Sequence, residues 1–218
     1  TAATVAGAAA AEELPRIGVG TNAGASSTWR DLILAKPSDP VSRATTRDFS
    51  VMLYTSGTTG RGKGVPRRHD AERAAALAHI AQNQYARSEV TLGVMPLYHT
   101  MGVRSLLASV MINGHFVCQR RFDPARALAL VGKHRITHLY LVPTLYHDLI
   151  THEAFESADI STVRKLGFAG QAMTDGLLQK LQAAFEPDLF VNHYGSSEIY
   201  TFTIEPDAAA KPGSAGKA

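Results

Sequence analysis

The chain has 218 residues, of which 45% are hydrophobic and 19% are charged, enough apolar material for one or two globular domains. No apolar run approaches the roughly 20 residues that cross a bilayer, and the Ala-rich start over residues 1–11 lacks the pattern of a signal peptide. We therefore expect no membrane segment. The formal net charge of +3 is compatible with an anionic ligand, and we expect no nucleic-acid partner.

The first part of the chain, residues 1–48, is rich in Ala, Gly, Ser and Pro. Its pattern contains one possible strand around residues 16–19 and a polar linker at 36–48. We expect a poorly ordered lead-in over residues 1–48, followed by a folded domain over residues 49–218.

From residue 49 onward, short β-type runs alternate with helical patterns. We expect strands at 51–55, 90–95, 116–119, 137–142, 165–169 and 189–194, and helices at 71–86, 103–112, 124–133, from about 144, and at 175–185. This alternation predicts an α/β fold in which helices flank a mostly parallel sheet. In such sheets the loops after the carboxyl ends of strands carry the chemistry.

The chain has a single cysteine, Cys118, which cannot form an internal disulfide. Because it ends the apolar run His115-Phe-Val-Cys118, we expect a buried, inert thiol. The absence of a disulfide framework favours the cytoplasm.

The strongest motif is Tyr54-Thr-Ser-Gly-Thr-Thr-Gly-Arg-Gly-Lys-Gly64, placed directly after a predicted strand. Glycines let backbone N–H groups approach phosphate oxygens, hydroxyl groups add neutral donors, and Lys63 supplies a positive charge. This composition predicts a polyphosphate cradle rather than an ordinary surface turn. Arg67 and Arg68 follow closely, and the sequence leaves open whether they contact phosphate or form a solvated basic surface.

The same run also has the G-x-x-x-x-G-K spacing of a Walker loop, from Gly57 to Lys63. A Walker loop needs Ser or Thr after the lysine to hold Mg²⁺, and this chain has Gly64 there. Pro66 also opposes immediate entry into a helix. A P-loop NTPase is therefore disfavoured.

Further segments occur downstream in a fixed order: Pro96-Leu-Tyr-His-Thr-Met-Gly102, Val142-Pro-Thr144, Phe168-Ala-Gly-Gln171 and Asn192-His-Tyr-Gly-Ser-Ser-Glu198. Together with the phosphate motif they resemble the adenylate-forming (AMP-binding) superfamily, in its aryl- and acyl-CoA ligase branch. The resemblance covers residues 46–217, the middle of a typical member and less than half of it. It implies a partial N-terminal domain without the C-terminal domain, which we expect to be inactive by itself.

The resemblance implies ATP, Mg²⁺ and CoA as ligands. It places the β- and γ-phosphates on Thr55, Ser56, Gly57, Thr58, Thr59, Gly60 and Lys63. It places the remaining nucleotide contacts on Gly170, Gln171, Tyr194, Gly195 and Ser197, with Tyr194 stacked on adenine. Glu198 stands where the family has a carboxylate that binds Mg²⁺.

The candidate catalytic residues are Lys63, His99 and Glu198. Adenylation needs no side-chain nucleophile, so we expect His99 to be a wall of the acid pocket rather than a base. Comparison with chlorobenzoate and benzoate ligases places Thr100, Met101, Tyr140, Ala169, His193, Gly195 and Tyr200 around an aromatic ring, and overall the chain is similar to the 2-furoate CoA ligases. Their polarity favours a ring acid with a heteroatom, such as a hydroxybenzoate or 2-furoate. Packing of His193 and Tyr200 into the sheet is the alternative.

The reaction implied by the resemblance joins a carboxylate to AMP with release of pyrophosphate, and then transfers the acyl group to CoA. The alternatives are a free-standing adenylation domain that loads a carrier protein, and a non-catalytic nucleotide-binding module. The expected partners are a small carboxylic acid, ATP and CoA, and the sequence leaves a homodimer open.

Overall fold

The computed structural model describes residues 17–18, 27–35, 41–55 and 62–217, which fall into two compact units, Thr1–Ala44 and Thr45–Ala218. In the first unit, β1 (Ile17–Gly18) pairs in parallel with β2 (Ser27–Thr28), and α2 (Trp29–Leu34) follows. The Thr28 and Asp31 side chains form a reciprocal capping box at the start of α2. The sequence predicted a strand here but not this helix.

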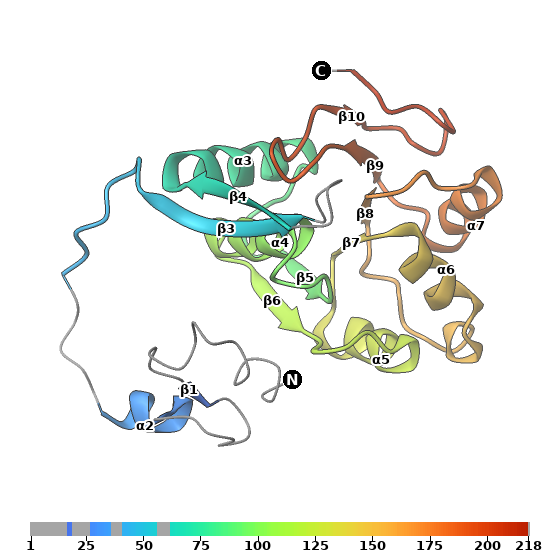
Figure 1. The fold of residues 1–218 in the computed structure, drawn as a ribbon. Helices are drawn as coiled ribbons and strands as arrows, with labels where there is room; N and C mark the ends of the chain where they lie inside the picture. The colour runs from blue at the N-terminus through green and yellow to red at the C-terminus, as the bar shows by residue number, and fades with distance from the viewer. Residues whose placement is uncertain (1–16, 19–26, 36–40, 56–61, 218) are drawn as a thin grey trace. The chain divides into compact units, whose positions relative to one another are not determined.

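A β-hairpin opens the second unit (Figure 1). Strand β3 (Phe49–Thr55) pairs antiparallel with β4 (Lys63–Arg68), and helix α3 (His69–Gln82) begins at once. The sequence predicted β3 but not β4, because Pro66 cannot donate to a strand ladder and usually argues against a strand. A two-stranded hairpin tolerates it, since each strand has an open edge. The predicted loop residues 56–61 lie outside the described residues.

The main sheet of the described residues has six strands in the order β10-β9-β8-β7-β5-β6. The parallel strands are β5 (Val90–Gly93), β6 (His115–Cys118), β7 (His138–Leu141), β8 (Lys165–Ala169) and β9 (Leu189–Tyr194). Strand β10 (Thr203–Glu205) pairs antiparallel with β9 and was not predicted. The predicted mostly parallel α/β sheet is confirmed.

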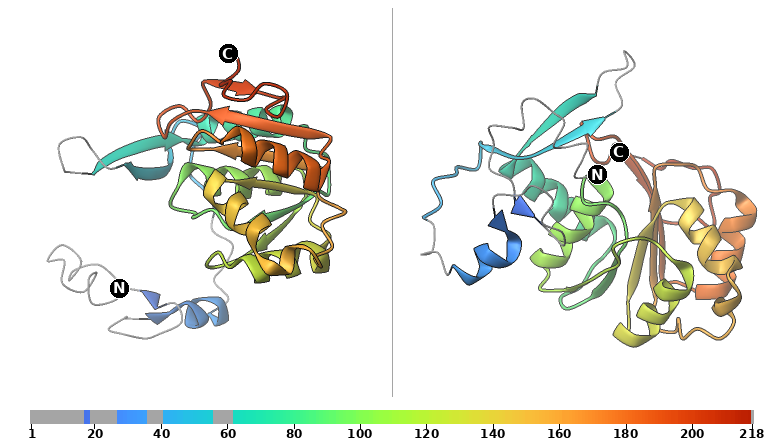
Figure 2. Two further views of the ribbon diagram at one scale, coloured as in Figure 1. Left: turned by 90° about the vertical axis from the view of Figure 1, so that its right-hand side faces the viewer. Right: turned by 60° about the horizontal axis from the view of Figure 1, so that its bottom comes forward.

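Helices cover both faces of this sheet (Figure 2). Helix α3 and helix α4 (Thr100–Met111) lie on one face, and α5 (Pro124–His134), α6 (Pro143–Thr151) and α7 (Asp175–Phe185) lie on the other. A short 3₁₀ turn, η2 (Glu153–Phe155), follows α6. Asp123 and Thr174 cap the amino ends of α5 and α7, because their side-chain oxygens accept from backbone N–H groups.

The two faces of the sheet are packed differently. The face under α5, α6 and α7 holds a large apolar core in which Leu139, Leu141 and Phe168 are fully buried. The opposite face holds a small apolar cluster of Met101, Tyr140 and Tyr200, surrounded by buried polar side chains. The apolar core supplies the stability of the fold, and the polar face holds the candidate site.

The prediction that Cys118 is buried is wrong. The thiol is exposed, because β6 is an edge strand and alternate residues along it face opposite sides. Val117 takes the buried position next to it. In the part of the chain that the structure describes, no helix has both the length and the apolar character to cross a membrane. The predicted domain boundary at residue 48 stays a prediction.

Candidate functional site

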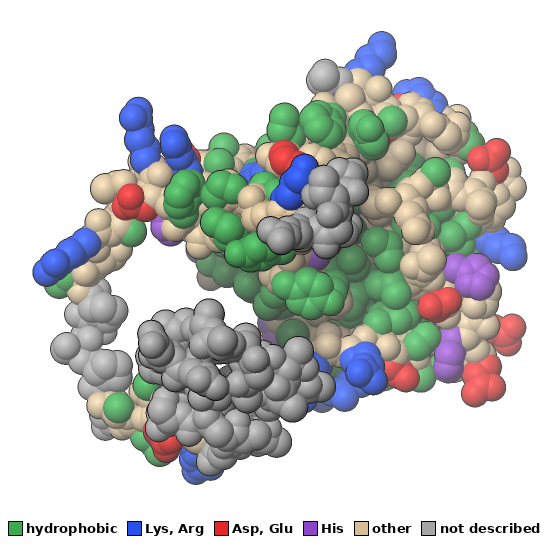
Figure 3. Space-filling view, in the orientation of Figure 1, with side chains coloured by type: hydrophobic (Ala, Val, Ile, Leu, Met, Phe, Trp, Pro, Cys, Tyr) green, Lys and Arg blue, Asp and Glu red, His purple; other side chains and the backbone are tan. Residues whose placement is uncertain are grey.

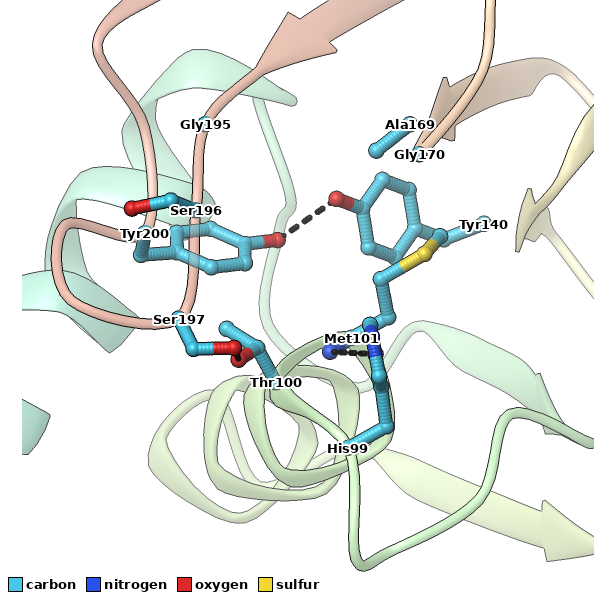
Figure 4. A pocket seen from close by; sticks show the side chains of 10 residues that line it. All are labelled: His99, Thr100, Met101, Tyr140, Ala169, Gly170, Gly195, Ser196, Ser197 and Tyr200. Atoms are coloured by element: carbon cyan, nitrogen blue, oxygen red, sulfur yellow. Dashed lines mark hydrogen bonds between the residues drawn. The ribbon is translucent and has the colours of Figure 1, made fainter. Parts of the chain in front are cut away.

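A cavity of about 170 Å³ lies where β7 and the end of β8 meet the segments after β5 and β9 (Figure 4). In parallel sheets this edge, at the carboxyl ends of the strands, is where ligands bind. Ten residues line the cavity: His99, Thr100, Met101, Tyr140, Ala169, Gly170, Gly195, Ser196, Ser197 and Tyr200. Nine of these ten, all except Ser196, are acid-pocket or nucleotide positions predicted from the sequence.

The amino end of α4 forms one wall of the cavity. His99 is the N-cap of this helix, and its Nδ1 atom accepts from the backbone N–H of Met101 at 3.3 Å. One turn on, a side chain at Gly102 would come within 2.2 Å of the Pro96 carbonyl oxygen. Glycine therefore allows α4 to pack against the segment before it. His99 is exposed at the rim, which fits the predicted pocket wall.

The loop after β9 forms the opposite wall. A side chain at Gly195 would come within 1.8 Å of the Tyr200 carbonyl oxygen, so the loop can double back only because residue 195 is glycine. The Ser196 N–H donates to the Ile199 carbonyl at 2.7 Å and closes the turn. This turn brings Tyr200 back into the cavity opposite Tyr140.

Tyr140 and Tyr200 present a pair of buried hydroxyl groups to the cavity. The hydroxyls point toward one another, and that of Tyr200 donates to that of Tyr140 at 2.7 Å (Figure 4). Burial raises the pKa of both groups above the ordinary value for tyrosine, so both are neutral. The Arg104 guanidinium lies 3.7 Å from the centre of the Tyr200 ring and holds it from the other side.

A second layer of buried polar residues lies behind the tyrosines. His193 does not line the cavity; its Nε2 atom is 3.1 Å from the Asn83 amide oxygen, and burial lowers its pKa to about 3. Asn83 donates to the His79 carbonyl at 2.8 Å, and the His79 Nδ1 atom lies 3.2 Å from the Tyr200 hydroxyl. Neutral imidazoles and an amide thus support the tyrosine pair.

His79, Asn83 and Arg104 were missed in the sequence. The only signal they give is their spacing: His79 and Asn83 are four residues apart, and Arg104 follows Thr100 by four. That spacing is common on any helix. For His193, the placement agrees with the alternative of packing against the sheet.

Two of the residues predicted to hold phosphate, Thr55 and Lys63, lie in the hairpin. Thr55 is the last residue of β3 and pairs with Lys63, the first residue of β4. The Lys63 side chain is exposed. Ser56, Gly57, Thr58, Thr59 and Gly60 lie outside the described residues. In the space-filling view, hydrophobic side chains gather on the face beside this hairpin (Figure 3). Met52 and Tyr54 of β3 are exposed.

The remaining nucleotide positions lie at the rim of the cavity. Gly170 has the positive φ of +86° that only glycine adopts freely, and Gln171 lines a neighbouring hollow of about 400 Å³. Tyr194 is exposed, and the centre of its ring lies 5.8 Å from that of Phe202. Ser197 reaches the cavity, where its hydroxyl is 3.5 Å from that of Thr100.

Glu198 has an exposed carboxylate. Among the described residues, no group of three or more His, Cys, Asp or Glu side chains is placed to hold a metal ion. A single hard oxygen ligand fits Mg²⁺, which usually binds through one or two carboxylates together with substrate phosphates and water. Glu198 could therefore hold Mg²⁺ only together with a nucleotide.

Comparison with known proteins places these observations in a family. Residues 4–218 match the AMP-binding enzyme family. The 4-chlorobenzoate–CoA ligase of Pseudomonas sp. (strain CBS-3) is 35% identical over 150 residues, 67% of this chain and 28% of that protein. The feruloyl-CoA synthase of Amycolatopsis sp. is 30% identical over 174 residues, 78% of this chain and 35% of that protein. The chain thus spans about a third of the curated relatives it matches.

Solved structures show the same fold. A fatty acyl CoA synthetase of Mycobacterium tuberculosis shares the fold with a TM-score of 0.79 at 22% identity, over 89% of this chain and 39% of that one. ATP-bound MatB of Rhodopseudomonas palustris gives 0.76 at 25% identity, over 90% and 41%. From its family match and its fold, this chain belongs to the AMP-binding enzyme family.

Proposed function

We propose that this chain supplies the acid pocket and phosphate hairpin of an ATP-dependent carboxylate–CoA ligase. The acid's carboxylate attacks the α-phosphorus of ATP and pyrophosphate leaves; the CoA thiol then attacks the acyl carbonyl and AMP leaves. Named relatives include CoA ligases for 4-chlorobenzoate and 2-succinylbenzoate, which supports CoA as the acceptor. The proposed ligands are a small acid, ATP, Mg²⁺ and CoA, and the proposed compartment is the cytoplasm.

The chain's own residues bind and orient these groups. Lys63, exposed at the end of β4, supplies a positive charge for the phosphates, and Thr55 lies beside it. Bound Mg²⁺ would neutralise charge on the phosphates and the leaving pyrophosphate, and Glu198 is the carboxylate that would hold it. No side chain forms a covalent bond with the substrate in this scheme, so the protein acts by positioning and electrostatics.

We further propose that the acid is a small aromatic or heteroaromatic ring that carries a hydrogen-bonding group, such as a hydroxybenzoate or 2-furoate. A cavity of about 150 Å³ is known to hold one benzene ring, and the volume here is about 170 Å³. The observation that supports a hydrogen-bonding group on the ring is the buried Tyr140–Tyr200 hydroxyl pair. A ring without a polar group leaves that pair facing an apolar surface.

The test is ATP–pyrophosphate exchange by the complete protein with a panel of acids. We expect exchange only when an acid is supplied, with 2-furoate or a hydroxybenzoate preferred over benzoate and cyclohexanecarboxylate. Equal or better turnover of decanoate would overturn the small aromatic pocket. A preference for plain benzoate would overturn only the proposal that the ring carries a hydrogen-bonding group.

A further inference from the structure

Arg67 connects two parts of the proposed adenylation site that are far apart in sequence. It lies in β4, four residues after Lys63, and its side chain is buried. Its Nη1 atom donates to the backbone carbonyl oxygens of Ser197 at 3.0 Å and of Glu198 at 3.1 Å. Its Nε atom donates to the carboxylate of Glu72 in the first turn of α3.

The charge of Arg67 is already paired. Glu72 is as deeply buried as Arg67, so the two form an ion pair shielded from solvent. A guanidinium group has several N–H donors in a fixed plane, and one edge can bind a carboxylate while the other binds carbonyl oxygens. Arg67 is therefore not the solvated surface charge that the sequence left open, and its charge is paired with Glu72.

We propose that Arg67 is a positioning residue that fixes the Ser197–Glu198 end of the loop against the strand that follows Lys63. The inference rests on the function proposed above. Ser197 stands at a predicted nucleotide position, and Glu198 is the proposed ligand of Mg²⁺. The bridge would set the distance between the lysine charge and the Glu198 carboxylate, which are on separate elements of the fold.

The other end of the same loop has its own support. Tyr200 is held by the Tyr140 hydroxyl at 2.7 Å and by the Arg104 guanidinium at 3.7 Å from its ring centre. Neither contact involves Arg67. Loss of the bridge should therefore disturb the nucleotide end of the loop and leave the acid end in place, which a purely structural role would not do.

The variant that isolates the bridge is the double substitution Arg67→Met with Glu72→Met in the complete protein. Arg67→Met alone would leave a buried, unpaired carboxylate and could unfold the protein, whereas replacing both charges with apolar groups of similar size is often neutral for stability. The matched control is Arg164→Met with Asp188→Met, which removes an exposed Arg–carboxylate pair in a different part of the fold.

We expect the MgATP concentration for half-maximal pyrophosphate exchange to rise about tenfold in the double variant, equivalent to about 1.4 kcal/mol. The KM for the acid should change less than about twofold, and the control should leave both values unchanged. Unchanged MgATP dependence in a folded double variant overturns the proposal. An equal rise in both KM values also overturns it, because that result indicates a general loss of structure.

A second measurement separates this inference from the proposed function. If the wild type shows no acid-dependent exchange, the proposed function fails, but the bridge can still be tested by amide hydrogen exchange. The N–H groups of Ser196 and Ile199 are hydrogen-bonded inside the loop. They should exchange faster in the Arg67→Met/Glu72→Met variant than in the wild type or the control. Identical exchange in all three proteins rejects the bridge.

Discussion

Replacing Tyr140 with Phe tests the pocket most directly, because it removes one oxygen atom from the cavity wall. The Tyr200 hydroxyl donates to Tyr140, so the proton of the Tyr140 hydroxyl remains available for an acceptor on the bound acid. Tyr140→Phe removes this donor and leaves the ring in place. The preference for a hydroxybenzoate or 2-furoate over benzoate should therefore fall.

The size of the effect follows from the hydrogen bonds involved. A neutral hydrogen bond contributes about 0.5 to 1.5 kcal/mol, so the ratio of kcat/KM values between the two acids should fall about two- to twelvefold. The cost to stability should stay at the low end of the same range, because the Tyr200 hydroxyl keeps a second polar contact, the His79 Nδ1 atom at 3.2 Å. The assay is a set of specificity constants for both acids, with the thermal midpoint as the measure of folding.

Tyr146→Phe is the matched control. The Tyr146 hydroxyl is also fully buried, but it donates to the carbonyl oxygens of Leu139 at 3.0 Å and Gly167 at 2.9 Å and does not line the cavity. Its loss should lower stability by about 1 to 3 kcal/mol and leave the acid preference unchanged. An unchanged preference in Tyr140→Phe, or an equal change in Tyr146→Phe, would refute the assignment of Tyr140 to substrate recognition.

Three further changes test the remaining assignments. Lys63→Ala should weaken MgATP use by about 1.5 to 3 kcal/mol, the worth of a charged hydrogen bond, as measured by KM in pyrophosphate exchange. Glu198→Gln should abolish most exchange and its normal magnesium dependence while the thermal midpoint stays the same, because the side chain is exposed. Glu89→Gln should lower stability at pH 7 by about 3 kcal/mol. Burial raises the pKa of Glu89, but hydrogen bonds from His138 and Lys165 outweigh it and lower the pKa from 4.5 to about 2. The stability difference should thus be full above pH 4.5 and shrink as the pH falls toward 2, as urea unfolding would show.

The sheet could be predicted because its elements have clear local patterns. The helix at 175–185 and the strands at 165–169 and 189–194 coincide with α7, β8 and β9. Strand β10 was missed because a three-residue strand has no detectable period. Strand β4 was missed because Pro66 argues against a strand and only the hairpin geometry allows it there.

The lining of the cavity could be predicted because its residues lie in short motifs next to strand ends. Gly102 and Gly195 show why these motifs have fixed spacing, since at each a backbone oxygen lies where a side chain would be. The buried polar residues behind the cavity could not be predicted. Helix α3 has alanine and polar residues on most sides, so its sequence does not show that His79 and Asn83 face the sheet.

Arg67 shows most clearly what a sequence pattern leaves out. Its position after a glycine-rich phosphate motif suggests a phosphate ligand or a surface charge, and both interpretations use only its neighbours in sequence. Its acceptors at Ser197 and Glu198 lie 130 and 131 residues away, and they are backbone carbonyl oxygens, which carry no sequence signal. Any residue type at 197 and 198 could accept these bonds. It follows that a substitution at Arg67 should affect the site more than most substitutions in the loop that Arg67 holds. Glu198 is the exception, because its own side chain is proposed to bind Mg²⁺.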